Sequence, residues 1–208
     1  MKQLQKHSFN PKVCRQELGE LQTLLSGKTS LKERDDVLPF FKRRHDLSML
    51  IATYFPLFRF PPDVLAHEYP LYGDFIADLI VGNTVEQQYL LVEFEDGTPK
   101  GLFVERAPKS ALEWAPRYEH AFSQVVDWFW KLDDMRSTGH YLRVFGSREA
   151  KFHGLIVTGK DVHLEKTEQE RLRWRQDRVV VDSKTISCTT FNGLSADLDF
   201  WLQTYYGK

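Results

Sequence analysis

The sequence lacks the motifs that mark several common enzyme classes. It has no Gly-rich phosphate loop, no G-x-S-x-G segment and no dinucleotide-binding fingerprint. Its two cysteines, Cys14 and Cys188, lie far apart and match no spacing of metal ligands, which excludes a Cys/His zinc motif and favours a reducing compartment. A cysteine nucleophile also fits poorly, because Cys188 lies in a Ser/Thr-rich segment with no histidine nearby in sequence.

The sequence also has almost no net charge and no long apolar run. The formal net charge is −1, so the chain as a whole attracts neither nucleic acid nor membrane, and any polyanion site has to be a local patch. No apolar run approaches the roughly 20 residues of a membrane span, and the first ten residues lack the apolar core of a signal peptide. We therefore expect a cytoplasmic protein without a membrane partner.

What the chain does contain is typical of a globular domain. Its 208 residues are 42% hydrophobic and 13% aromatic, which is enough for a sizeable core. We expect a helical lead-in over residues 1–29, with a helix that begins near Pro11 and ends near Gly27, and a main domain over 30–208 with its core at about 60–160. Ser30 and Glu33 have the spacing of a capping box, which predicts a second helix to about Phe55, broken near Pro39.

The remaining elements alternate between strand and helix. Three strand patterns at short spacing predict an antiparallel meander, and the later patterns predict helices and further strands. The fold class is therefore α/β or α+β, with layered helices and strands. The expected strands are 64–72, 74–81, 89–95, 152–159 and 179–181, and the expected helices are 116–136, 164–177 and 193–206.

Carboxylates in two of these strands form an unusual constellation. Alternation places Glu93 and Glu95 on one face of the strand 89–95, roughly 6.6 Å apart, and Asp78 among apolar residues of the preceding strand. In that strand, alternation pairs Asp78 with Ile76 and Ile80 on one face. Like charges held close repel each other, and a hard divalent cation removes the conflict. The bland alternative is that these side chains face solvent on edge strands.

The same residues resemble a known nuclease family. Asp78, followed about fifteen residues later by Glu93-Phe94-Glu95 at the end of a hydrophobic strand, looks like the PD-(D/E)xK core. More narrowly, HEYPLYGDFIADLIV, YLLVEFED and AFSQVVDWFWKL followed by FHGLIVTGK resemble the nuclease domain of Shedu, a bacterial anti-phage defence family. The resemblance covers roughly 30–200. It implies a restriction-endonuclease-like fold, with a central mixed sheet flanked by helices, and a DNA endonuclease or exonuclease that depends on Mg²⁺ or Mn²⁺.

The resemblance also implies roles for particular residues. Asp78 and Glu93 would ligate the metal, Phe94 would contribute its backbone carbonyl, and Glu68 would add an acidic group from just before the motif. Gln124 would point at the site and at the nucleic-acid backbone. These roles together imply catalysis by a carboxylate-held divalent cation.

One position departs from the family pattern. Glu95 stands where a lysine usually stabilises the charge of the transition state. Either Glu95 is a tolerated variant that adds charge for the metal, or a lysine reaches in from elsewhere, or the site has lost its chemistry. Lys100 and Lys109 in the following loop are the nearest replacements. If the chemistry is lost, the chain is a catalytically inactive module that binds DNA or protein.

Partners follow from the same reasoning. The expected substrate is double-stranded DNA with ends or nicks, contacted by Lys100, Arg106, Lys109 and Trp128; Trp128 alone is more typical of a core residue. Basic runs at 42–45 and 171–178 either contact phosphates or form solvated faces. The resemblance implies a homo-oligomer, with Trp201, Tyr205 and Tyr206 as a candidate interface. Larger family members carry a long sensing region, whose role here falls to residues 1–55 or to a separate sensor protein.

Overall fold

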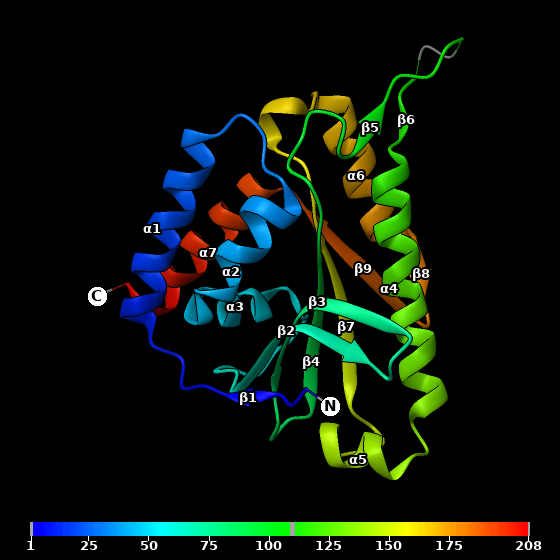
Figure 1. Cartoon of the computed structure of the whole chain (residues 1–208). Helices are drawn as coiled ribbons and strands as arrows, with labels where there is room; N and C mark the ends of the chain where they lie inside the picture. Colours follow the sequence, from blue (N-terminus) through cyan, green and yellow to red (C-terminus); the bar gives the residue numbers. More distant parts are fainter. Residues whose placement is uncertain (1, 109–110, 208) are drawn as a thin grey trace.

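A mixed seven-stranded sheet is the centre of the described part of the chain, residues 2–108 and 111–207 of a computed structural model. Helices cover both faces of the sheet, so the fold is a three-layered α/β arrangement, as predicted (Figure 1). In spatial order the strands are β1 (Gln5–Lys6), β2 (Val64–Leu71), β3 (Phe75–Asn83), β4 (Gln88–Phe94), β7 (Lys151–Val157), β9 (Lys184–Thr189) and β8 (Val180–Val181).

The helices divide into two groups that bury two separate hydrophobic clusters. One face of the sheet carries α1 (Pro11–Gly27), α2 (Leu38–Lys42), α3 (His45–Leu50) and α7 (Phe191–Tyr206). The other face carries α4 (Pro116–Met135), α5 (Gly139–Phe145) and α6 (Lys166–Arg178). Shorter helical elements are a π-helical turn (Glu33–Val37) and two 3₁₀ turns (Ile51–Tyr54 and Asp161–His163). A separate hairpin is formed by β5 (Phe103–Val104) and β6 (Glu113–Trp114).

The predicted meander is confirmed. β2 pairs antiparallel with β3, and β3 pairs antiparallel with β4. The chain then crosses the sheet through α4 and returns in β7, which pairs parallel with β4. Because β4 lies between β3 and β7, its side chains are buried on both faces of the sheet. The acidic segment therefore lies at the end of an interior strand.

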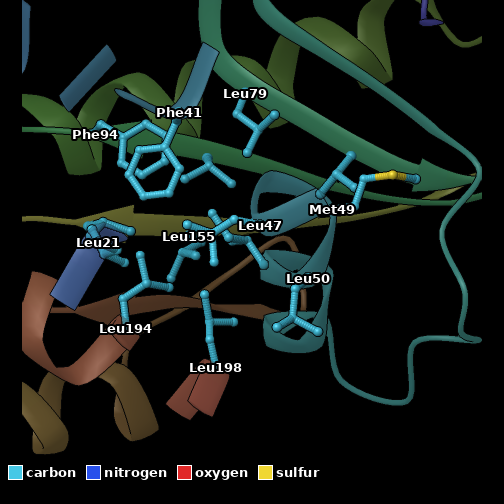
Figure 2. Close-up of a cluster of buried hydrophobic side chains, with 14 of the residues drawn as sticks. Leu21, Phe41, Leu47, Met49, Leu50, Leu79, Phe94, Leu155, Leu194 and Leu198 are labelled. Atoms are coloured by element: carbon cyan, nitrogen blue, oxygen red, sulfur yellow. The ribbon is translucent and has the colours of Figure 1, made fainter. Parts of the chain in front are cut away.

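The alternation predicted for β4 is also confirmed. Leu90, Val92 and Phe94 join the cluster beneath α1, α2 and α7, whereas Leu91 joins the cluster beneath α4. Figure 2 shows the first cluster, in which the ring of Phe41 stacks on the ring of Phe94. Their ring centroids are 4.5 Å apart and their planes differ by 15°. This contact fixes α2 against the end of the acidic strand.

The lead-in helix packs into the same core as the rest of the fold. Its apolar stripe, Leu18, Leu21 and Leu25, is buried against α7 and α3, and Asn10 caps it by accepting the N–H groups of Lys12 and Val13. The division at residue 30 stays a prediction, because α1 and the main domain share one hydrophobic cluster.

One local expectation is wrong, and two elements were not predicted. The capping box does not form: the N–H of Glu33 donates to Asp96 Oδ1 at 2.8 Å, since Asp96 reaches it from the end of the sheet. Residues 184–189, where no strand was predicted, form β9, whose Ile186 and Cys188 are buried beside β7. Residues 139–145 form α5, which was not predicted. Both segments are short and contain few apolar residues, so they show no clear hydrophobic period in the sequence.

The alternation predicted for β3 holds after Asp78 but fails before it. Leu79 and Val81 lie in one cluster as expected, but Ala77 lies with Ile80 in the other. The partner strand changes phase at the same place, where Glu68 has a left-handed backbone with φ 45°. The β2–β3 hairpin therefore bends at Glu68 and Asp78 and curls away from β4 (Figure 1).

No helix among the described residues has the length and apolar character needed to cross a lipid bilayer. This finding agrees with the absence of long apolar runs in the sequence.

A close approach of helix and sheet gives a stability test. A Cβ added at Gly154 in β7 would lie 2.4 Å from a methyl group of Val125 in α4. We expect Gly154→Ala to lower the free energy of unfolding by about 1–3 kcal/mol through overpacking. Urea denaturation followed by circular dichroism measures this change.

Gly19 in α1 is the matched control. A Cβ there would meet no heavy atom within 4 Å, so Gly19→Ala should stabilise the chain by up to about 1 kcal/mol because alanine is the better helix former. Equal effects of the two substitutions would contradict the close packing of α4 on β7.

Candidate active site

A cleft of about 1000 Å³ opens where the β2–β3 hairpin bends away from β4. Its walls come from the N-terminal helical turns, the hairpin, the end of β4 and the start of α4. Among the described side chains, acidic and basic groups line it in similar numbers, together with His120 and Gln124. The charged lining residues are Lys2, Glu33, Arg34, Lys42, Glu68, Asp78, Glu93, Glu95 and Arg117.

Asp78 is held by the backbone of the neighbouring strand. The paired register of β3 and β4 ends at Leu79 opposite Val92, and its continuation places Asp78 beside Glu93. The N–H of Phe94 donates to Asp78 Oδ2 at 2.8 Å. Where the strands separate, this carboxylate oxygen thus accepts the hydrogen bond that a backbone carbonyl accepts in a regular sheet. Burial raises the pKa of Asp78 to about 7, although this hydrogen bond opposes the shift.

Glu93 is the most perturbed carboxyl of the cleft. Its side chain is buried, with 7% of the residue exposed. Burial raises the pKa of Glu93 to about 10, and the negative charges of Asp78 and Glu95 act in the same direction. A carboxyl group in this setting is neutral at pH 7 unless a cation joins it. Asp78, Glu93 and Glu95 all line the same cleft.

Glu95 faces an arginine instead of open solvent. Arg117 Nη1 lies 3.0 Å from Glu95 Oε2, 3.0 Å from Asp96 Oδ1 and 3.6 Å from a carboxylate oxygen of Glu33. Burial raises the pKa of Glu95 to about 7, and the charge of Arg117 lowers it in part. The guanidinium thus neutralises several carboxylates at the rim of the cleft.

One face of α4 lies along the cleft. Arg117, His120 and Gln124 recur at helical spacing and all line it, which places Gln124 where the resemblance implies. Trp128, the next residue on this face, is fully buried in the hydrophobic cluster beneath α4. The expected contact of Trp128 with DNA is therefore wrong, because a ring without exposed surface has no face left for a base.

Glu68 and Lys42 form an ion pair at the opposite wall. Lys42 Nζ, at the end of α2, lies 2.8 Å from Glu68 Oε1. The pairing of His67 with Leu79 and of Tyr69 with Ala77 brackets Glu68 and Asp78, so these two residues face each other across the hairpin. The hydrogen bond from Lys42 lowers the pKa of Glu68. Glu68 therefore lies within the acidic constellation, already paired with a cation.

Two of the other expected DNA contacts, Lys100 and Arg106, lie away from the cleft lining. Lys100 is exposed in the loop that follows β4. Arg106 lies on the β5–β6 hairpin, which projects from the body in Figure 1, and its Nη1 contacts a carboxylate oxygen of Glu113 at 3.1 Å. Lys109 lies outside the described residues. Their contact with DNA stays a prediction.

Sequence reasoning missed several residues that shape the cleft. It did not assign Arg117, Glu33 or Asp96 to the site, and it treated Lys42 only as part of a basic run. One signal was present: Arg117 lies in the first turn of α4, where the helix dipole disfavours a cation. A basic residue in that position indicates a nearby anionic partner.

The donor set suits a cation that keeps part of its water shell. Among the described residues, no group of three or more His, Cys, Asp or Glu side chains is arranged to hold a metal ion. Asp78 and Glu93 supply two carboxylates, and their raised pKa values show an unmet need for positive charge. Mg²⁺ is commonly bound by one or two carboxylates with waters and substrate phosphate, so this pair fits it.

One comparison with known proteins identifies a relative. A family model described as "Shedu protein SduA, C-terminal" matches residues 30–195. The match begins where the sequence predicts the main domain to begin, and it contains every lining residue named above except Lys2. No curated protein matches the chain.

The raised pKa values predict a pH-dependent stability. Glu93 binds its proton more tightly in the folded chain than in the unfolded chain, whose value is near 4.5. The folded state therefore loses stability as pH rises from about 4.5 towards 10. Without divalent cations, we expect wild type to lose at least about 1.4 kcal/mol more than Glu93→Gln between pH 5 and pH 8.

Urea denaturation at both pH values in a chelator measures this difference. Glu86→Gln, at an exposed turn position, is the matched control and should behave like wild type. The same pH dependence in wild type and Glu93→Gln would show that Glu93 is not perturbed.

Proposed function

The chain belongs to the Shedu family, and from this premise we propose that it is a metal-dependent nuclease that hydrolyses phosphodiester bonds in double-stranded DNA. Family membership indicates a role in anti-phage defence. The observation that carries the proposed activity is the meeting of Asp78 and Glu93 in a cleft that also presents cationic side chains. Buried carboxylates beside cations suit a site for a metal ion and a phosphate.

The topology supports a PD-(D/E)xK core. The acidic residues lie on the second and third strands of a meander, and a helix then crosses to a strand parallel with the third. Asp78 comes from β3 and Glu93 from β4, at the place where the two strands separate. Strand separation opens room for a substrate next to backbone and side-chain oxygens.

The proposed metal ligands are Asp78 and Glu93, with Glu68 nearby and the carbonyl of Phe94 as a backbone donor. The N–H of Glu95 bonds to Val157 of β7 at 2.9 Å, whereas the N–H of Phe94 faces Asp78. The N–H and C=O of one residue in a strand point to the same side, so the carbonyl of Phe94 also faces Asp78. A bound Mg²⁺ or Mn²⁺ would supply an activated water and stabilise the charge of the phosphoryl transition state.

The other cleft residues provide contacts for the nucleic acid. Gln124 and His120 offer hydrogen bonds along α4, and Arg34 and Arg117 offer charge-assisted bonds to phosphate oxygens. Lys100 and Arg106 extend the proposed contact beyond the cleft, and Lys109, outside the described residues, stays a proposed DNA contact. The near-zero net charge implies that affinity depends on this local set of cations.

The alternative is a catalytically inactive module that binds DNA or protein on the same fold. Glu95 in the place of the motif lysine favours it, as does the lack of a three-ligand metal cluster among the described residues. This alternative predicts binding that survives Glu93→Ala, with no metal uptake and no cleavage.

A homo-oligomer remains part of the proposal. Tyr205 is 63% exposed on α7, and its ring lies 4.1 Å from the ring of Trp201. The exposed aromatic surface at the end of α7 is a candidate interface between copies of the chain. A separate sensor protein is a second proposed partner.

Metal binding and cleavage, measured on the same samples, test the function. We expect wild type to bind Mn²⁺ and to cut linear or nicked duplex DNA. Asp78→Ala and Glu93→Ala should lose measurable Mn²⁺ binding and reduce cleavage at least about 100-fold, because each removes a proposed ligand. Isothermal titration and gel assays measure the two effects.

Glu86→Ala is the matched control and should keep both properties. Cleavage that is equal in wild type and in both cleft variants would indicate a contaminating nuclease. DNA binding without metal uptake or cleavage in wild type would favour the inactive module.

A further inference from the structure

At the end of β4 the cleft presents the carboxylate of Glu95, where cleavage of a phosphodiester requires a cation. A phosphodiester carries negative charge, and hydrolysis increases the charge on its oxygens. Glu95, at the end of β4, cannot stabilise that charge. A cation from another element has to reach the same cleft from a fixed position.

We propose that Lys42, at the end of α2, is the catalytic cation of this cleft and contacts the phosphate beside Asp78 and Glu93. This inference rests on the proposed nuclease function and deepens it. Lys42 lines the cleft together with Leu38, one helical turn earlier, and Arg34 before it. Its ammonium group lies 2.8 Å from Glu68 Oε1, and Glu68 faces Asp78 across the β2–β3 hairpin.

The position of Lys42 is fixed by the acidic strand itself. Phe41, the preceding residue, stacks on Phe94, which lies between Glu93 and Glu95 (Figure 2). Both rings are buried. The backbone that carries Lys42 is therefore held against the backbone that carries the carboxylates, which gives the ammonium group a defined place on a rigid element.

The other cations of the cleft fit the role less well. Arg117 lies within 3.0 Å of carboxylate oxygens of Glu95 and Asp96 and 3.6 Å from Glu33, so three carboxylates share its charge. Lys42 forms its ion pair with Glu68, a residue in contact with solvent. The ammonium group of a lysine has three rotatable donors on a flexible stem, so it can exchange a solvated carboxylate for a phosphate. Lys2 lines the cleft as well and is the competing lysine.

Cleavage kinetics of lysine variants test the proposal. On linear duplex DNA with Mn²⁺, Lys42→Ala should lower kcat about 100-fold while the Mn²⁺ affinity changes less than about threefold. Lys42→Arg should recover part of the rate, because it keeps the charge but not the geometry. Lys131→Ala is the matched control, since Lys131 forms an ion pair with Asp74 outside the cleft. It should cleave like wild type.

A metal-free measurement provides a second readout. The affinity for a short DNA duplex, measured by fluorescence anisotropy without divalent cations, should fall about threefold or more in Lys42→Ala but not in Lys131→Ala, because one phosphate contact is lost. Circular dichroism confirms that each variant is folded. This affinity reports the phosphate contact of the ammonium group independently of turnover.

The outcomes separate the inference from the proposed function. If wild type cleaves and Lys42→Ala cleaves equally, or if Lys2→Ala alone loses activity, Lys42 is not the catalytic cation. An unchanged metal-free affinity for the duplex in Lys42→Ala would also overturn the inference. If wild type cleaves DNA with neither metal, the result contradicts the proposed nuclease function itself, and with it the catalytic role of Lys42.

Discussion

Two carboxylates at the buried end of β4 impose the constraint on which the rest of the site depends. Glu93 and Glu95 are almost inaccessible to water, and Asp78 approaches them from the neighbouring strand. Water cannot solvate this much negative charge in so little space, so the chain has to supply positive charge or keep protons bound. Arg117 from α4 and Lys42 from α2 both line the cleft, but the pKa of Glu95 stays raised despite Arg117, and that of Asp78 stays raised despite Lys42.

The same constraint explains why the N-terminal turns belong to the site. The N–H of Glu33 bonds to Asp96 at the end of the acidic segment, and Phe41 stacks on Phe94. These contacts hold residues 33–42 against the strand end, and Glu33, Arg34 and Lys42 of this segment line the cleft. A substitution in the buried Phe41–Phe94 pair would therefore alter the cleft without touching a charged group.

Much of the site could be predicted from the sequence. The alternation in β4 identified Glu93 and Glu95, the isolated carboxylate identified Asp78, and the family resemblance pointed to Gln124, which lines the same cleft. Arg117 and Glu33 escaped notice because their roles depend on contacts with residues distant in sequence. Trp128 was assigned to DNA, although the same helical spacing that brings Gln124 to the cleft carries Trp128 into the core.

The sequence by itself determined the class of fold, the meander and the acidic pair on its strands, because apolar alternation and turn residues act over short distances. Only the tertiary structure decided which cations meet those carboxylates, where the β2–β3 hairpin bends, and that β9 completes the sheet beside β7. The physical reason is that charge compensation and strand order depend on contacts between residues far apart in the chain. Local patterns carry no information about which of those contacts the folded chain will make.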